Sequence, residues 1–254
     1  MNAPREVDCV VVGAGLAGAT LAVGLAEQGL SVVTVDARSR TAEAPGRDVR
    51  GLALAPATQH LLTRLGLWEA LAPVANPLRE IVVTDRGQFG STVLRCADLG
   101  VPALGWVCPA DRLLARLDAA LMNLSAVTSC WHSTVTDIEA AAGRVTLRVV
   151  HADSDAGECL PTRLLVAADG LHSVVRQHFG IEVTSHDYGQ TAIVCNADVE
   201  RPTPHTAYER FTRDGPLAVL PLGGRRVVVV RSARTDDVAT LMHLSDEAFG
   251  ADVQ

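Results

Sequence analysis

Three glycines near the start of the chain have the spacing of a phosphate-binding loop. They are Gly13, Gly15 and Gly18 in the sequence GAGLAG, which follows the apolar run from Asp8 to Val12. In a G-x-G-x-x-G loop the first glycine permits a tight turn, the second lets the backbone approach a pyrophosphate, and the third allows close packing of helix against strand. Unpaired N–H groups at the start of the following helix attract the phosphates. The spacing therefore predicts a dinucleotide site.

An acidic residue stands where such a site needs an acceptor for ribose hydroxyls. Asp36 ends a second apolar run, Leu30 to Val35, and small and apolar residues at helical spacing separate the two runs. Strand, helix, second strand and terminal acid together favour a dinucleotide site over a chance glycine loop. This motif alone does not separate FAD from NAD.

A second candidate segment reads LLVAADGLHSVVRQHFGI. Its apolar start predicts a buried strand over 163–169, and Asp169 and Gly170 then lead into a short helix. By itself this pair is typical of an ordinary turn between a strand and a helix. We interpret His172 and His178 as bystanders, because neither has a visible partner in the sequence.

The elements that position these residues alternate between strands and helices, with one interruption. The first two strands and their helix predict a parallel strand–helix–strand unit. Strand-like runs at 81–85 and 91–95 form a hairpin-like insertion, and an amphipathic helix follows Pro109. Four more strand-like runs occupy 191–232, so we expect a mainly antiparallel sheet that includes the insertion.

Composition excludes several classes of function. The net charge of -7 leaves no basic footprint for nucleic acid, so no nucleic-acid partner is expected. All 22 basic residues are arginines, which excludes a Schiff-base lysine and a P-loop lysine. The six cysteines are scattered without metal-ligand spacing, and we interpret them as reduced thiols with no metal site. The N-terminal residues lack the pattern of a signal peptide, which favours a cytoplasmic location.

Taken with the glycine loop, the second segment resembles the second fingerprint of the FAD-dependent aromatic-ring hydroxylases, a family of flavoprotein monooxygenases. In that family a buried strand leads into D-G, then Ser and Arg, near the cofactor pyrophosphate, and the segment has been linked to both FAD and NAD(P)H binding. The resemblance implies that the dinucleotide is FAD. It assigns cofactor binding to four residues of this chain, namely Asp169, Gly170, Ser173 and Arg176.

Two arginines extend the resemblance. Arg50, in RDVRGLALAP, matches an arginine of the family that contacts the flavin nucleotide, although an arginine in a polar loop is usually just solvated. Arg112, in PADRLLARL, stands where the family often has a polar or basic residue near the phosphates. Asp111 is an alternative match for that position, and an exposed helical arginine is the ordinary interpretation of Arg112.

The resemblance extends over the chain and implies a fold and its domains. The expected fold class is α/β, with a Rossmann-like FAD-binding domain, containing a parallel sheet and the βαβ unit, interleaved with a mainly antiparallel β substrate domain. The FAD-binding domain is expected over 1–76 and 101–182. The substrate domain is expected over 77–100 and 183–254, incomplete at its C-terminal end.

The segments TDRG, YGQTAIVCNADV and AYERFTRDGPLAVLPL are similar to the ubiquinone-biosynthesis branch of the family, above all its polyprenyl-methoxyphenol hydroxylases. This implies that NAD(P)H reduces the flavin and that O₂ then forms a flavin hydroperoxide, which hydroxylates a polyprenylated phenol. The cofactor performs the difficult step, so no catalytic acid, base or nucleophile is assigned. A polyprenylated substrate implies peripheral contact with the membrane surface or with a quinone-biosynthesis complex.

One family motif is missing before Gln254. The third fingerprint, a G-D segment followed by a glycine-rich helix start, contacts the ribityl chain in the family and does not occur here. We therefore expect a truncated chain. Its alternative function is a non-catalytic FAD-binding or partner-binding module. A simple NAD-dependent oxidoreductase is a third hypothesis, against which the D-G segment and the antiparallel second half argue.

Overall fold

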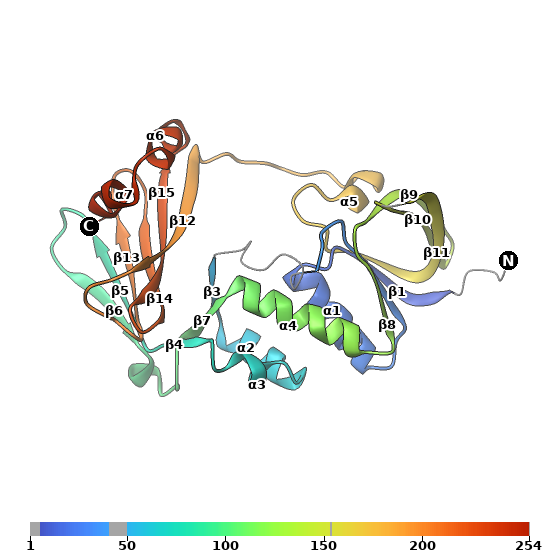
Figure 1. Cartoon of the computed structure of the whole chain (residues 1–254), viewed down its shortest axis with the longest axis horizontal. Coiled ribbons are helices and arrows are strands. Elements are labelled where there is room, and N and C mark those ends of the chain that lie inside the picture. The colour runs from blue at the N-terminus through green and yellow to red at the C-terminus, as the bar shows by residue number, and fades with distance from the viewer. Residues whose placement is uncertain (1–5, 41–49, 153, 254) are drawn as a thin grey trace. The chain divides into compact units, whose positions relative to one another are not determined.

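The computed structural model describes residues 6–40, 50–152 and 154–253, which form two compact units (Figure 1). The first unit consists of the described parts of Met1–Arg47, Leu65–Leu67 and Leu113–Thr184. The second consists of those of Asp48–Arg64, Trp68–Arg112 and Ser185–Gln254. The α/β fold class expected from the sequence is confirmed.

A six-stranded sheet in the order β8-β2-β1-β11-β10-β9 organises the first unit. The strands β8, β2, β1 and β11 run parallel, whereas β10 is antiparallel to both of its neighbours. Helix α1 is the crossover between β1 and β2, as the strand–helix–strand pattern predicts. The elements are β1 (Val7–Val12), α1 (Leu16–Glu27), β2 (Val32–Val35), α4 (Ala110–Asn123, which begins in the second unit), β8 (Val127–Cys130), β9 (Ser133–Ala141), β10 (Arg144–His151), β11 (Ser154–Ala167) and α5 (Val174–His178).

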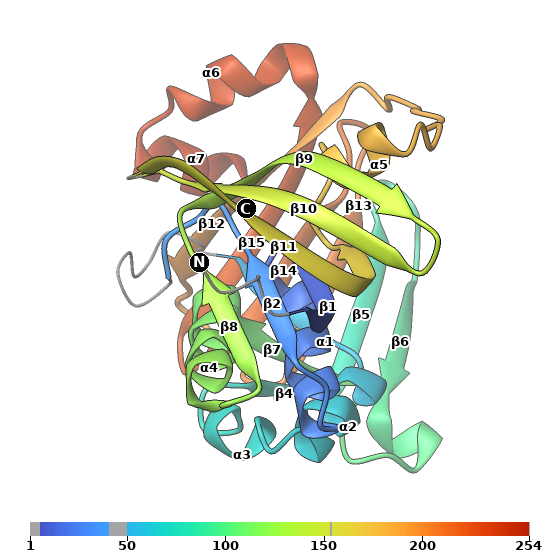
Figure 2. The same ribbon diagram turned by 90° about the vertical axis from the view of Figure 1, so that its right-hand side faces the viewer.

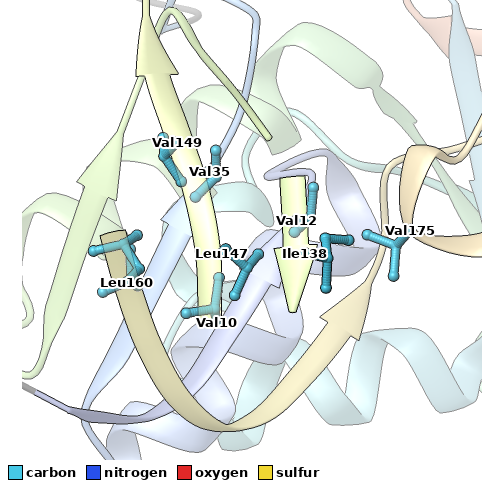
Figure 3. Packing of buried hydrophobic residues seen from close by; sticks show 9 residues of the cluster. Val10, Val12, Val35, Ile138, Leu147, Val149, Leu160 and Val175 are labelled. Atoms are coloured by element: carbon cyan, nitrogen blue, oxygen red, sulfur yellow. The ribbon is translucent and has the colours of Figure 1, made fainter. Parts of the chain in front are cut away.

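The core of the first unit lies between the parallel strands and the β9–β10 hairpin. Val10 and Val12 alternate onto one face of β1, and Val35 extends that face on β2. Leu147 and Val149 of β10 pack against them, as Figure 3 shows, and Figure 2 shows the hairpin crossing β1 and β2. Each of these buried side chains contributes about 1.5–3 kcal/mol relative to an exposed position. The hairpin is therefore fixed over one face of the parallel sheet.

The strand expected to be buried over 163–169 is only partly so. It forms the second half of β11, and Leu164 in it is 51% exposed. The cause is its pairing: β10 pairs with β11 only as far as Thr162, and the residues that follow pair with β1 alone. This half of β11 has no strand on its other edge within the described residues.

A second six-stranded sheet, in the order β12-β15-β14-β13-β5-β6, organises the second unit. The expected hairpin of β5 and β6 is confirmed, and β5 joins the later strands through parallel pairing with β13. All other pairs in this sheet are antiparallel. Its strands are β5 (Glu80–Asp85), β6 (Ser91–Arg95), β12 (Gln190–Asp198), β13 (Thr206–Phe211), β14 (Leu217–Gly223) and β15 (Arg226–Arg234).

The second unit also contains a three-stranded sheet, β3-β7-β4, which the sequence pattern did not predict. Its strands are β3 (Gly51–Leu54), β4 (Asn76–Leu78) and β7 (Gly105–Pro109). The helices of the second unit are α2 (Pro56–Arg64), α3 (Trp68–Leu71), η2 (Cys96–Leu99), η3 (Thr235–Asp237), α6 (Val238–Met242) and α7 (Asp246–Asp252). No helix in the described part of the chain combines the length and the apolar character needed to cross a bilayer.

The two compact units divide the chain at other positions than the expected domains, whose boundaries stay a prediction. Residues 50–64, 68–76 and 101–112, expected in the FAD-binding domain, belong to the second unit. The pairing of β3 and β4 with β7 explains this assignment, because it holds these stretches in one small sheet. The polar composition between Thr41 and Arg50 predicts a loop, of which residues 41–49 lie outside the described part of the chain.

The buried cysteines should be unreactive. Burial, together with the negative charge of Asp111, raises the pKa of the Cys108 thiol to about 11, and Cys159 is exposed. Because the thiolate is the nucleophile, iodoacetamide at neutral pH should label Cys159 and leave Cys108 unmodified in the folded chain. Peptide mass spectrometry after timed labelling measures this, with the urea-unfolded chain as the control. Equal labelling of the two thiols in the folded chain would contradict the described burial.

A second prediction concerns pH. Burial raises the pKa of the Glu209 carboxyl on β13, so the folded state disfavours its charged form. The resulting destabilisation of the folded state is absent at pH values below the ordinary carboxyl pKa. It is fully present once the pH exceeds the raised pKa of Glu209. Glu209→Gln should therefore raise Tm by about 1–3 °C at pH 7 and have little effect at pH 4. Calorimetry at both pH values tests this, with exposed Glu200→Gln as the control. A shift independent of pH would contradict it.

Candidate functional site

Two glycines of the loop, Gly13 and Gly18, make contacts that leave no space for a side chain. Gly13 has a φ of 92°, and a Cβ added there would overlap the carbonyl oxygen of Ala168 at the end of β11. A Cβ on Gly18 would overlap the carbonyl oxygen of Gly13 and lie 3.0 Å from the Cβ of Ala168. The loop, the first turn of α1 and the end of β11 therefore meet in direct contact.

Gly15 differs from the other two glycines. It is the N-cap residue of α1, no side chain caps the helix there, and no acidic residue occupies the first turn. A Cβ added to Gly15 would meet no atom within 4 Å, and the residue lines a cavity. The helix start thus keeps backbone N–H groups without a side-chain cap beside open space, the arrangement that attracts a phosphate.

Asp36 follows β2 and faces the loop. Its Oδ2 accepts a hydrogen bond from the backbone N of Ala14 at 2.6 Å, and its Oδ1 accepts one from the backbone N of Arg38 at 2.8 Å. The side chain of Asp36 is only 14% exposed and also lines the cavity. Two backbone donors therefore hold this carboxylate in position.

The D-G segment forms both the turn and part of the cavity wall. The Oδ2 of Asp169 accepts hydrogen bonds from the backbone N atoms of Val174 at 2.8 Å and Val175 at 3.4 Å. Its Oδ1 is buried and has no hydrogen-bond partner within the described part of the chain. Gly170 has a φ of 82°, which explains the glycine there. One carboxylate oxygen of Asp169 thus stabilises the turn, and the other has no partner among the described residues.

Ser173 and Arg176 stabilise this turn from behind. The Oγ of Ser173, a buried residue, accepts a hydrogen bond from the backbone N of Arg176 at 3.0 Å. The guanidinium of Arg176 donates to the carbonyl oxygen of Leu171 at 2.7 Å. Neither residue lines the cavity. In this structure they support the segment rather than form its surface.

The cavity has a volume of about 400 Å³ and lies wholly within the first unit. It brings together five of the residues predicted from the sequence, namely Gly13, Gly15, Asp36, Asp169 and Gly170. Gly18 packs beneath the loop. Arg50 and Arg112 belong instead to the second unit, where the backbone N of Ala110 donates to the carbonyl oxygen of Arg50 at 2.9 Å.

Part of the wall was missed by sequence reasoning. Ser133, Thr134 and Val135 at the start of β9 line the cavity, and so does His172, which the sequence analysis interpreted as a bystander. The strand pattern of β9 was visible, but nothing in it indicates that the hairpin folds back over the ends of β1 and β2. The adjacency of His172 to the D-G pair was the one available indication.

The charges around the cavity restrict what it can bind. Among the described residues, its wall carries two carboxylates, Asp36 and Asp169, and no arginine. A phosphate must therefore be held by backbone N–H groups and the helix dipole, while the carboxylates suit hydroxyl or amine donors. Among the described residues no cluster of His, Cys, Asp or Glu is arranged to hold a metal ion.

These features define a Rossmann-like dinucleotide-binding protein. Residues 6–249 match the family model described as FAD binding domain, and the chain belongs to this family. The expectation that the dinucleotide is FAD is thereby confirmed. The observed cavity fits FAD, because an orphaned carboxylate oxygen and an uncapped helix start both border it.

Curated relatives match along nearly the whole chain. Ubiquinone hydroxylase UbiL of Rhodospirillum rubrum is 36% identical over 254 residues, which are 100% of this chain and 58% of the relative. Ubiquinone hydroxylase UbiM of Neisseria meningitidis is 29% identical over 97% of this chain and 54% of its own length. 3-Demethoxyubiquinol 3-hydroxylase of Escherichia coli is 31% identical over 87% of this chain and 55% of its own length. The chain thus spans little more than half the length of these relatives.

Solved structures share the fold at low sequence identity. PqsL of Pseudomonas aeruginosa, described as a probable FAD-dependent monooxygenase, aligns with a TM-score of 0.80 and 19% identity over 97% of this chain and 70% of its own. p-Nitrophenol 4-monooxygenase PnpA of Pseudomonas putida aligns with a TM-score of 0.80 and 19% identity over 99% of this chain and 62% of its own. At this identity the likeness establishes the fold alone.

Substitutions of the loop glycines should separate folding from binding. Gly18→Ala places a methyl group into the Gly13 carbonyl and should lower Tm by at least about 4 °C. Gly15→Ala meets no protein atom, so Tm should change little while FAD affinity falls about tenfold or more, because the methyl group occupies cavity space.

Gly24→Ala is the matched control. It lies in the same helix, and its added Cβ would meet only Leu65 at an ordinary 3.8 Å. Thermal unfolding and FAD titration by fluorescence quenching measure the two effects. If Gly15→Ala lowered Tm as much as Gly18→Ala, the distinction between the two glycines would be wrong.

Proposed function

We propose that this chain carries the FAD-binding part and much of the substrate domain of an NAD(P)H-using monooxygenase. The reaction is hydroxylation of a polyprenylated phenol in ubiquinone biosynthesis, with O₂ as co-substrate. The observation that carries the proposal is the cavity enclosed by the glycine loop, Asp36 and Asp169, in a chain whose curated relatives include two ubiquinone hydroxylases. A polyprenylated substrate also suggests peripheral contact with a membrane surface.

In this proposal each part of the cavity binds a different part of the adenosine diphosphate half of FAD. The loop at Gly13 and Gly15 and the uncapped start of α1 bind the pyrophosphate. Asp36 accepts hydrogen bonds from ribose hydroxyls, since its anchored carboxylate borders the cavity. The unpaired Oδ1 of Asp169 gives a second acceptor.

The other predicted residues act less directly. Gly170 permits the turn, whereas Ser173 and Arg176 hold that turn in place. Arg50 and Arg112 remain proposed cofactor ligands on the strength of the family resemblance. Their two segments are joined by the pairing of β3 with β7, so they would act together.

FAD, when bound, supplies the redox and oxygen chemistry, and the residues of this chain bind and orient it. Apolar residues such as Val12, Val35 and Val135 form part of the cavity wall. The two carboxylates hold hydroxyl groups rather than move protons in this proposal. No catalytic acid or base is therefore assigned among the described residues.

A second candidate function is a non-catalytic FAD-binding module. The observation in its favour is that the cavity of the described residues accounts for the adenosine diphosphate half of FAD, and no catalytic acid or base is assigned beside it. In this case the adenosine half of FAD binds as described above, and turnover does not occur. Both candidates require the same cavity.

Spectroscopy of the purified chain tests these alternatives. Flavin absorption bands that co-purify, together with NAD(P)H oxidation stimulated by a short-chain prenylated phenol, are the result expected for the monooxygenase. Bound flavin without stimulated oxidation favours the module. Failure to bind FAD, checked by adding it in excess to the folded chain, would exclude both.

The same assay checks the ribose acceptor. Asp36→Asn should weaken FAD binding by about tenfold or more, because it removes a charged hydrogen-bond acceptor. Glu139→Gln, an exposed acid on β9, is the matched control and should bind as the unaltered chain does. Equal affinities for Asp36→Asn and the control would remove Asp36 from the proposed site.

A further inference from the structure

Arg38, Asp36 and Asp118 form a group of charged side chains next to the glycine loop, and Arg38 and Asp118 have no role assigned above. Its centre is Arg38, whose guanidinium donates to Asp118 Oδ1 at 2.7 Å and to Asp118 Oδ2 at 3.0 Å. Asp118 is on α4 and only 3% exposed. This is a two-pronged ion pair, and its carboxylate is buried.

The same guanidinium reaches the glycine loop. It donates a hydrogen bond to the carbonyl oxygen of Ala14, the residue between Gly13 and Gly15. On its other side, the backbone N of Ala14 donates to Asp36. Ala14 is therefore held at both polar atoms, one by Arg38 and one by Asp36.

Arg38 also contacts Asp36 directly. Its backbone N donates to Asp36 Oδ1 at 2.8 Å, and its Nε lies 3.5 Å from Asp36 Oδ2. One guanidinium is thus shared between two carboxylates, but its two shorter contacts go to Asp118. Because Asp118 holds the guanidinium in this way, Asp36 keeps its excess negative charge beside the cavity.

One further contact of the guanidinium and the packing of α4 fix the ion pair in space. It lies over the ring of Trp131, 4.7 Å from the centroid, in a cation–π arrangement. Asp118 follows the fully buried Leu117 on α4, and Leu121 is buried one turn later. The anchor of the pair is therefore part of a packed helix face and has little freedom to move.

We propose that Arg38 and Asp118 are positioning residues for the adenosine half of the cofactor. They act through Asp36 and the Ala14 peptide, which they hold in the binding arrangement before the ligand arrives. Such preorganisation strengthens binding because less ordering is needed on association. The identity of the ligand rests on the proposed function, whereas the effect on the loop does not.

Amide hydrogen exchange tests the effect on the loop without any ligand. Asp118→Asn keeps the shape of the side chain and removes its charge. In the nucleotide-free chain we expect exchange at the Ala14 amide to become about tenfold faster or more, with the amides of β10 unchanged. Arg38→Lys, which cannot make the two-pronged pair, should act in the same direction and is the alternative if Asp118→Asn fails to fold.

Affinity measurements test the effect on the cofactor. Both variants should bind FAD and ADP about tenfold more weakly, by similar factors for the two ligands, because the change is confined to the adenosine diphosphate half. In an Asp36→Asn background the same substitutions should cost less than about threefold, since two residues that act through a third are not additive with it. Asp137→Asn, an exposed acid on β9, is the matched control.

The contrary results are distinct from one another. Unchanged Ala14 exchange and affinity in a folded variant would overturn the proposal. Equal losses of FAD and ADP affinity in the Asp36 and Asp36→Asn backgrounds would also overturn it. So would faster amide exchange throughout the sheet, because either result indicates a general effect on stability. If the unaltered chain bound neither FAD nor ADP, the proposed function would fail, and with it the assigned ligand, while Ala14 exchange would still report whether the pair orders the loop.

Discussion

The candidate site depends on the direct backbone contact between the glycine loop and the end of β11. Gly13 lies against the Ala168 carbonyl, and Gly18 lies against Gly13, with no space for a Cβ at either position. This contact joins two segments that are separated by about 150 residues, and it sets the distance between their two carboxylates. Asp36 and Asp169 border one cavity because β1 pairs with β2 on one side and with β11 on the other. A bulkier loop would move the D-G segment away and open the cavity.

Charge is distributed around this contact in a consistent way. Backbone N–H groups at the start of α1 are left for an anion, and no arginine among residues 6–40, 50–152 and 154–253 lines the wall to compete for it. Arg38, whose guanidinium contacts the loop at the Ala14 carbonyl oxygen, is paired with the buried Asp118 through two hydrogen bonds and does not line the cavity. Asp36 consequently stays an acceptor, as hydroxyl groups of a ribose require. The helix dipole thus favours the phosphates of a dinucleotide at the start of α1, whereas Asp36 is left to accept hydrogen bonds from its ribose hydroxyls.

Local patterns in the sequence were sufficient for the parts of the fold that are set by neighbouring residues. The apolar runs of β1 and β2, the glycine spacing and Asp36 all lie within one strand–helix–strand unit, where periodicity and turn chemistry determine structure. The failures have a different origin. The exposed half of β11 and the β3-β7-β4 sheet result from pairing between distant segments, which no short window contains. Arg38 escaped notice for the same reason, because an arginine two residues after an acid is usually solvated, and its buried partner is 80 residues away.

The order of the chain has a consequence for how the site forms. The residues that line the cavity belong to the first unit, yet they come from segments before and after the stretches 50–64 and 68–112 of the second unit. The pairing of Val12 with Ala167 closes the sheet only when strands far apart in the sequence meet. Contacts of such long sequence separation cost loop-closure entropy before they contribute stability, so they form late and slowly. The glycine loop and Asp36 can be arranged locally, whereas the wall formed by Asp169 and β9 requires the completed sheet. A ligand that contacts both parts therefore stabilises the long-range pairing itself, which links cofactor binding to the folding of the first unit.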